Sequence, residues 1–156
     1  MPKIDSSKVQ VVTGSTYPKE HAGPCLGRHA LRLGQAAGLT QFGVNRLRLP
    51  PGTWSAQRHW HAAEDEFIYV LAGEVVLVTD AGEQLLRAGD AAGFPAGVPD
   101  GHHLQNRSQQ EAIVLEVGSR RPAEEAVAYP GIDLALRRGE SRYVHLDGRP
   151  YPPAGG

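Results

Sequence analysis

Apolar residues recur at every second position in short runs along this chain, and a glycine or proline interrupts the pattern about every ten residues. Side chains alternate between the two faces of a strand, so this period of two predicts short, half-buried strands. The segment 42–49 is a clear case, because it stops at Pro50, Pro51 and Gly52, where proline cannot donate to a sheet ladder. Many short strands with turn residues between them predict an all-β sandwich or barrel.

The middle of the chain is expected to form a meander of hairpins, joined by tight turns such as Ala72-Gly73 and Asp80-Ala81-Gly82. The expected strands are 42–49, 54–61, 67–71, 74–79, 84–87, 91–94, 102–105 and 112–117. Their number suits a small closed barrel. Outside this region, we expect two edge strands within residues 1–40, a helical turn at 123–128, and an irregular tail at 149–156 that is rich in proline and glycine.

The length of 156 residues indicates one domain. We expect it to span residues 1–156, with the barrel core at about 40–118 and the terminal extensions packed on the barrel or on a partner subunit. A chain of this size can bury roughly 70% of its unfolded surface, so it needs no disulfide framework to fold. The single cysteine, Cys25, agrees with this and is expected to be a small apolar filler.

The balance of charges excludes several kinds of partner. A formal net charge of −1 gives no overall field that would attract nucleic acid or an anionic membrane. No stretch approaches the ~20 consecutive apolar residues of a membrane helix, and the N-terminus does not resemble a secretion signal. We therefore expect a cytoplasmic protein that binds a small molecule and has neither a nucleic-acid nor a membrane partner.

Two histidines, His59 and His61, stand two residues apart in a run that is expected to be a strand. On a strand this spacing puts both imidazoles on one face, whereas on a helix they would point to nearly opposite sides. Glu66 follows after a short polar link, and His102 enters a later strand from a turn. Histidine nitrogens and a carboxylate oxygen suit a divalent first-row metal ion. These four side chains therefore predict a cage of three imidazoles and one carboxylate.

The residues of this cage belong to two motifs that resemble those of the cupin superfamily. The first motif is a glycine, His-x-His, three or four residues, a glutamate, six residues and a glycine, and it is matched by Gly52, His59, His61, Glu66 and Gly73. The second motif, Gly-x5-Pro-x-Gly-x2-His-x3-Asn, is matched by Gly89, Pro95, Gly97, His102 and Asn106. Gly52 lies one residue further from its histidine than usual, and two extra residues lie between Gly97 and His102. Both differences fall in turns, where length varies at little cost.

The resemblance implies the cupin double-stranded β-helix, a jelly-roll barrel, with extended N- and C-terminal segments. It also implies a homodimer and one divalent metal ion, Zn, Fe, Mn or Ni, with the ligands His59, His61, Glu66 and His102. Stretches such as Arg58-His-Trp-His and Gly101-His-His-Leu-Gln-Asn are similar to those of small bacterial single-domain cupins. Some of that group carry a sugar-phosphate isomerase-like label. The resemblance thus implies a fold and a metal site, while a substrate does not follow from a fold.

Side chains that share a strand face with the expected ligands are candidates for the wall of a substrate pocket. By this parity they are Ser55, Gln57, Ile68 and Val70. The same rule turns Trp54 and Trp60 away from the histidines, where packing is their expected role. It also turns His103 away from His102, which predicts a position at the surface or at an interface.

Three kinds of function stay open. The first is an enzyme in which the metal ion acts as a Lewis acid on a small oxygen-bearing substrate, as an isomerase, lyase or dioxygenase. The second is a non-catalytic cupin that binds or senses a small molecule, and the third is a barrel that the metal only stabilises. No general base is evident except Glu66 or a metal-bound hydroxide. A phosphorylated sugar would need a cation near the pocket, for which the candidates are Arg46, Arg48 and Arg58.

Overall fold

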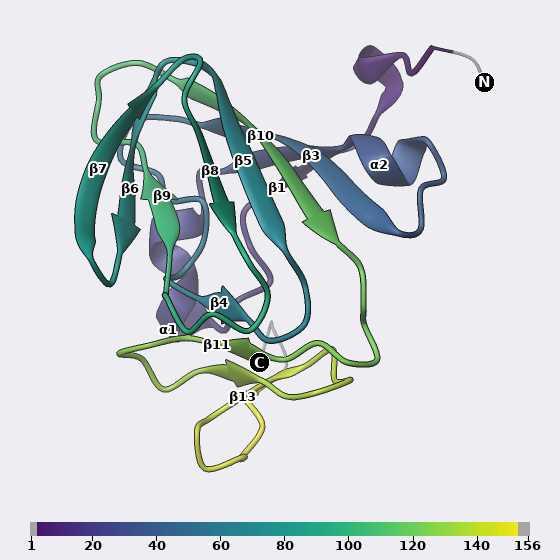
Figure 1. Ribbon diagram of the computed structural model, residues 1–156, viewed down its shortest axis with the longest axis vertical. Coiled ribbons are helices and arrows are strands. Elements are labelled where there is room, and N and C mark those ends of the chain that lie inside the picture. Colours follow the sequence, from purple (N-terminus) through teal and green to yellow (C-terminus); the bar gives the residue numbers. More distant parts are fainter. Residues whose placement is uncertain (1–2, 153–156) are drawn as a thin grey trace.

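A long antiparallel pairing between β3 (Phe42–Leu49) and β10 (Ala112–Ser119) runs through the larger sheet of the barrel. In the computed structural model, which describes residues 3–152, this sheet has six strands in the order β1-β2-β3-β10-β5-β8 (Figure 1). The other strands are β1 (Val11–Thr13), β2 (His29–Arg32), β5 (Glu66–Ala72) and β8 (Ala91–Phe94). Every neighbouring pair in the sheet is antiparallel.

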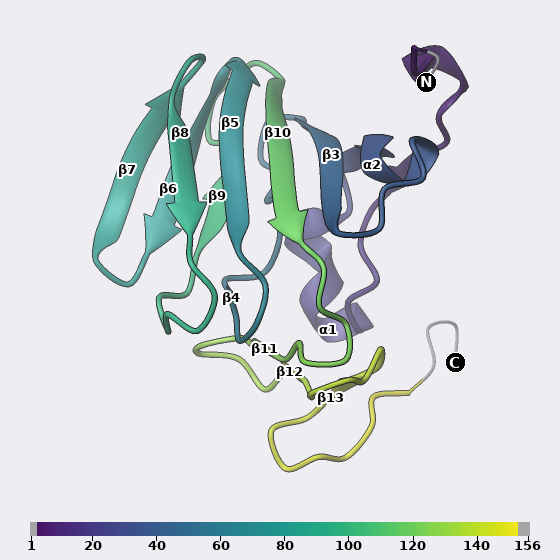
Figure 2. The ribbon, with the colours of Figure 1, turned by 45° about the vertical axis from the view of Figure 1, so that its right-hand side comes forward.

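A smaller sheet forms the other wall of the barrel, with the order β7-β6-β9 (Figure 2). Its strands are β6 (Glu74–Thr79), β7 (Gly82–Arg87) and β9 (His103–Gln105). Both sheets contribute to one apolar core, which includes Leu47, Ile68, Val70 and Val114 from the larger sheet and Val75, Leu77, Leu86 and Leu104 from the smaller one. This arrangement is the expected all-β double-stranded β-helix.

Strand β5 shows how the alternation in the sequence sets the two faces of the sheet. Ile68 and Val70 are 2% and 0% exposed, whereas Phe67, Tyr69 and Leu71 are 44%, 38% and 46% exposed. Inward and outward side chains thus alternate as a strand requires. Glu66 begins the same strand with the parity of Ile68, so its carboxylate enters the barrel interior with the apolar residues.

The N-terminal segment supplies the two edge strands that were expected, since β1 and β2 extend the larger sheet beyond β3. Short helical turns accompany them, namely η1 (Ser6–Lys8), α1 (Lys19–Ala22), η2 (Gly23–Cys25) and α2 (Leu33–Ala36). Cys25 is fully buried, and burial raises the pKa of its thiol to about 11. This placement fits an inert apolar filler.

The C-terminal segment forms a further small sheet with the order β13-β12-β11-β4. Its strands are β4 (Trp60–His61), β11 (Val127–Ala128), β12 (Ala135–Leu136) and β13 (Tyr143–Val144). In both ribbon views it lies across the lower end of the barrel (Figures 1 and 2). Val127, Tyr129 and Leu134 form its buried cluster, against which Tyr151 of the predicted tail packs. The C-terminal segment therefore covers the end of the barrel where His61 lies.

Most of the expected strands are confirmed, and two expectations are wrong. The strand expected over 54–61 is regular only at Trp60–His61, since 55–58 are bends. The helical turn expected at 123–128 is also absent from the described chain: 122–124 form a turn, and Val127–Ala128 pairs with β4 instead. Tertiary pairing here overrides a local preference. Residues 153–156 of the expected irregular tail lie outside the described residues.

Within residues 3–152, no helix has both the length and the apolar character that crossing a membrane requires.

Candidate metal centre

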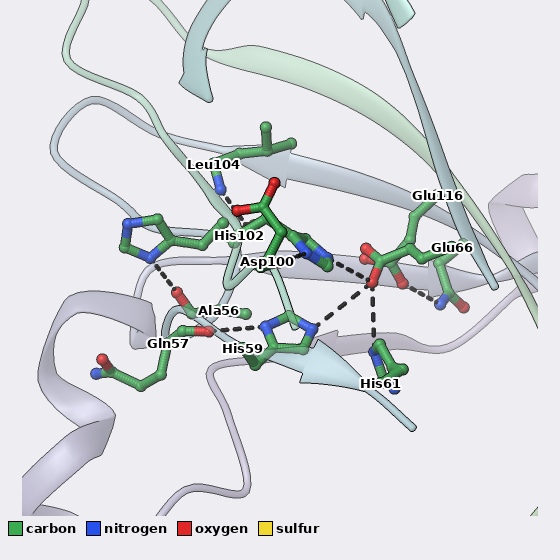
Figure 3. A network of polar contacts seen from close by, with 12 residues as sticks. Ala56, Gln57, His59, His61, Glu66, Asp100, His102, Leu104 and Glu116 are labelled. Atoms are coloured by element: carbon green, nitrogen blue, oxygen red, sulfur yellow. Dashed lines mark hydrogen bonds and ion pairs between the residues drawn. The ribbon is translucent and has the colours of Figure 1, made fainter. Parts of the chain in front are cut away.

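Three imidazoles meet one carboxylate inside the barrel (Figure 3). The Nε2 atoms of His59, His61 and His102 lie 3.6, 3.4 and 3.2 Å from Oε2 of Glu66. The side chain of Glu66 is 13% exposed, and that of His102 is 4% exposed. Donor atoms of His59, His61 and Glu66 all lie within 4.8 Å of one another, close enough to hold one metal ion. These four residues are called the His-Glu cluster below.

Different parts of the chain bring the cluster together. His61 belongs to β4 and Glu66 begins β5, while His59 and His102 face each other in an isolated antiparallel bridge. The ring centroids of His59 and His61 are 4.9 Å apart, so the two rings converge as their spacing predicted. The backbone therefore holds the imidazoles in place independently of any ligand.

The second nitrogen of each imidazole shows which nitrogen can bind a metal. Nδ1 of His59 lies 2.8 Å from the carbonyl oxygen of Gln57, and Nδ1 of His102 lies 3.2 Å from that of Asp100. A carbonyl oxygen can only accept, so each Nδ1 carries the proton. In the neutral rings Nε2 is then a bare lone pair directed at the cluster. This is the usual arrangement of metal-binding histidines, in which a second hydrogen bond fixes the tautomer.

Glu125 lies behind the remaining imidazole, whose buried Nδ1 has no hydrogen-bond partner within residues 3–152, and it was missed in the sequence. Its Oε1 lies 3.5 Å from Nδ1 of His61, and its two oxygens accept hydrogen bonds from the backbone amides of Ala62 and Ala63 at 3.0 and 3.3 Å. Glu125 is 8% exposed. A carboxylate behind a histidine raises the basicity of the ligating nitrogen. In the sequence Glu125 is only an acidic residue after the last barrel strand. No motif or regular spacing connects it to His61.

Electrostatics within the cluster show that the site favours a cation. Burial acts to raise the pKa of Glu66, but His102, His59 and His61, which donate from Nε2 when their rings are protonated, outweigh it and hold that pKa well below its ordinary value. Burial acts to lower the pKa of His61, yet Glu66, Glu125 and Glu64 reverse this and raise it. In the neutral rings of His59 and His102 the Nε2 lone pairs face this carboxylate, and a positive charge between them would relieve the repulsion. The donor set therefore fits a divalent metal ion, which would supply that charge.

A cavity of about 970 Å³ opens beside the His-Glu cluster and includes its four side chains in its wall. Of the predicted wall residues, Ser55 and Ile68 do line it, whereas Gln57 and Val70 do not. Gln57 donates its side-chain amide to the carbonyl oxygen of His21 at 2.6 Å, because the bends at 55–58 break the expected alternation. Val70 is fully buried within the apolar core.

Glu116 on β10 is a second carboxyl group in the cavity wall, and sequence reasoning missed it. Its backbone pairs with Asn45 of β3 on one side and with Ile68 of β5 on the other. The side-chain amide of Asn45 donates to Oε1 of Glu116 at 2.8 Å. Burial and then the charge of Glu66 raise the pKa of Glu116. Glu116 is a charged residue on the same strand face as the apolar Ala112 and Val114, and this signal in the sequence could have revealed it.

The cations expected to serve a phosphorylated substrate are placed elsewhere. Arg48 pairs with Glu111 at 2.7 Å, and Arg58 pairs with Asp80. Neither of them nor Arg46 is part of the cavity wall, so this expectation is wrong. The arginines that line the cavity are Arg28, Arg32 and Arg120.

His103 is also placed differently from the prediction. It is 5% exposed rather than at the surface, and its Nδ1 donates to the carbonyl oxygen of Ala56 at 2.9 Å. Its ring packs against Trp54 with centroids 4.6 Å apart, which confirms a packing role for that tryptophan. Burial lowers the pKa of His103. The side chain turns away from the cluster, as parity predicted, but into other parts of the protein.

Comparison with known proteins agrees with this fold. Residues 45–118, which contain the whole His-Glu cluster, match the Cupin domain family. A solved structure from Silicibacter pomeroyi, a sugar phosphate isomerase from the cupin superfamily, is 42% identical, with 97% of each chain covered and a TM-score of 0.90. The chain therefore belongs to the cupin superfamily.

Two other solved structures are similar. One is a candidate sugar phosphate isomerase from Acidithiobacillus ferrooxidans. It is 30% identical over 78% of each chain, with a TM-score of 0.71. The polyketide cyclase RemF from Streptomyces resistomycificus is 24% identical, covers 85% of this chain and 87% of its own, and has a TM-score of 0.65. The last similarity shows the fold alone. Among curated proteins, none matches this chain.

Proposed function

We propose that this protein is a metal-dependent enzyme that isomerises a small phosphorylated sugar. One divalent ion, Zn, Fe, Mn or Ni, would be held by His59, His61, Glu66 and His102. The observation that carries the proposal is the convergence of three Nε2 atoms on one carboxylate oxygen at 3.2–3.6 Å. The substrate class is suggested by the sugar phosphate isomerase from Silicibacter pomeroyi, since the similarity extends over 97% of both chains.

The cavity offers the groups that such a reaction requires. Interconversion of an aldose and a ketose moves one hydrogen between two carbons and one between their oxygens, with no net gain or loss of atoms. A divalent ion, when bound, supplies a Lewis acid for the sugar's oxygens. Glu116 lines the same cavity outside the His-Glu cluster, and its raised pKa favours a carboxyl group that holds a proton. Asn45 fixes the orientation of that carboxyl group.

Reconstitution with single metals tests the proposal. The protein is stripped with a chelator, loaded separately with Zn, Fe(II), Mn(II) or Ni(II), and mixed with aldose and ketose phosphates such as ribose 5-phosphate and fructose 6-phosphate. We expect one equivalent of bound metal and aldose–ketose interconversion, followed by NMR, with at least one ion. A protein that retains no stoichiometric metal would contradict the metal site.

The same experiment separates the enzyme from the alternative, a non-catalytic cupin that binds or senses a small molecule. Binding of a sugar phosphate without turnover under every metal would favour the binding protein and overturn the isomerase. The cytoplasmic location and the homodimer stay predictions.

A further inference from the structure

Arg28 is a guanidinium in the cavity wall that is held by backbone oxygens only. It lies in the link between η2 and β2 and is half-buried. Its Nε donates to the carbonyl oxygen of Gly14 at 2.8 Å, and its Nη1 donates to the carbonyl oxygen of Ser55. Its own carbonyl accepts from the amide of Gly14 at 2.9 Å. Backbone and side chain are thus both fixed, so the guanidinium has a defined position in the cavity.

Arg28 differs from the other fixed arginines of this protein in its charge balance. Six arginines form ion pairs with carboxylates, and they are Arg48, Arg58, Arg87, Arg107, Arg121 and Arg149. Among residues 3–152, no carboxylate lies within 4.0 Å of the Arg28 guanidinium, and its Nη2 donates to no protein acceptor. The charge of Arg28 acts on the more distant carboxyl group of Glu116, but no carboxylate pairs with it directly, and carbonyl oxygens offset a half-buried charge only in part. An anion in the cavity would complete the pairing.

One short segment sets the spacing between Arg28 and the His-Glu cluster. The carbonyl oxygen of Ser55 accepts from Arg28, and the carbonyl oxygen of Gln57, two residues later, accepts from Nδ1 of His59. The guanidinium and a cluster imidazole are therefore anchored to the same stretch of backbone. Both line the cavity of about 970 Å³, which is large enough for a small sugar derivative. A ligand could reach both groups at once.

We propose that Arg28 binds the oxyanion, a phosphate or a carboxylate, of a ligand whose other end reaches the His-Glu cluster. The proposal rests on the proposed function for the idea that this cluster holds the metal ion. A guanidinium offers N–H groups in a fixed fork that matches two oxygens of either oxyanion. Arg28 has hydrogens on Nη2 and a second hydrogen on Nη1 for this purpose, because the two carbonyl oxygens occupy only Nε and one Nη1 hydrogen.

Calorimetry of the full chain with three probes tests the assignment. The probes are ribose 5-phosphate, gluconate and ribose, which carry a phosphate, a carboxylate and no charge. We expect the wild-type protein to bind one of the two anions better than ribose, and the preferred anion identifies the oxyanion. Arg28→Gln should weaken binding of that anion by about tenfold to a hundredfold, the range for a charged hydrogen-bonded contact, and leave ribose binding unchanged. Arg48→Gln, an arginine paired with Glu111 on the exterior, should change neither.

Two further measurements keep the test decisive. Metal content, determined by elemental analysis, should be the same in Arg28→Gln as in the wild type. If the variant keeps its metal and still prefers the anion as strongly as the wild type does, the role of Arg28 is overturned and the proposed function stays intact. A loss of metal from the wild type would instead contradict the proposed function. If Arg28→Gln does not fold, the Nε signal of Arg28 in the NMR spectrum of the wild type should shift with the preferred anion and not with ribose. No shift at saturation would overturn the proposal.

Discussion

His59 and His102 face each other across an isolated antiparallel bridge, in which the amide of each donates to the carbonyl oxygen of the other at 3.1 and 2.9 Å. Their rings are 4.9 Å apart although 43 positions, from 59 to 102, separate them in the sequence. A direct backbone pairing thus sets the distance between two imidazoles of the cluster. Because folding itself orders these two imidazoles, a metal ion would meet ligands that are already oriented.

The first prediction concerns His102. Replacing it with alanine removes one of the three converging nitrogens and should weaken metal binding by more than about a hundredfold. This exceeds the loss expected when a residue that only orients a ligand is replaced. Metal content after dialysis against a weak chelator measures this. His145→Ala is the matched control, because His145 pairs with Asp133 at 2.7 Å away from the cluster and its loss should leave metal content unchanged. Full retention of metal by His102→Ala would contradict the ligand assignment.

Glu125→Gln tests the orientation of His61. The glutamine can keep a hydrogen bond from a backbone amide but loses the negative charge next to Nδ1 of His61, which lies 3.5 Å away. We expect about 10- to 100-fold weaker metal binding with little change in the fold. Glu124→Gln, next to it but exposed and paired with Arg121, serves as the control. Equal metal affinity in the two variants would show that Glu125 does not act through His61.

Glu116 should give the metal-free protein a pH-dependent stability. Burial and the charge of Glu66 raise the pKa of Glu116 in the folded state above its ordinary value of 4.5. The folded protein therefore holds this proton more tightly than the unfolded chain does. The free energy of unfolding should fall as the pH rises from the unfolded pKa to the folded one, by up to about 1.4 kcal/mol per pH unit.

Glu116→Gln removes this titration, so the difference in unfolding free energy between variant and wild type should grow in favour of the variant over that pH range. Urea unfolding of both proteins, without metal and at a series of pH values, measures the difference. A constant difference across the range would show that the pKa of Glu116 is the same in both states.

Gly73, in the turn between β5 and β6, should cost more stability to replace than Gly131 does. Its φ is 72°, and a Cβ atom there would lie 2.7 Å from the carbonyl oxygen of Glu111. Gly131 has a similar φ of 84° with no atom within 4 Å of such a Cβ. Gly131→Ala should cost only the backbone strain of about 1–2 kcal/mol, and Gly73→Ala should cost more because the backbone must also shift. Equal costs in urea unfolding would show that the turn adapts freely.

The homodimer implied by the cupin resemblance is a prediction about the assembly. Size-exclusion chromatography with light scattering at micromolar concentration should give about twice the chain mass of 16.8 kDa. A mass that stays at one chain over the accessible concentration range would contradict it.

Local patterns in the sequence were sufficient for most of the barrel and for the composition of the candidate cluster. Strand β3 and strand β6 begin and end where the alternation and the turn residues predicted. His59 and His61 converge because residues two apart in extended backbone face the same side, and this held although only Trp60–His61 is regular strand. The same rule failed at Gln57, where bends interrupt the extended backbone.

The sequence by itself determined the strands, their inward faces and the residue types available to bind a metal, because these follow from the period of the side chains along one strand. Only the tertiary structure decided which distant groups share the cavity. Glu125 reaches His61 through the pairing of β11 with β4, and Arg28 enters the cavity because carbonyl oxygens of Gly14 and Ser55 hold it there. Such contacts depend on how segments far apart in the chain pack, and no local period records that packing.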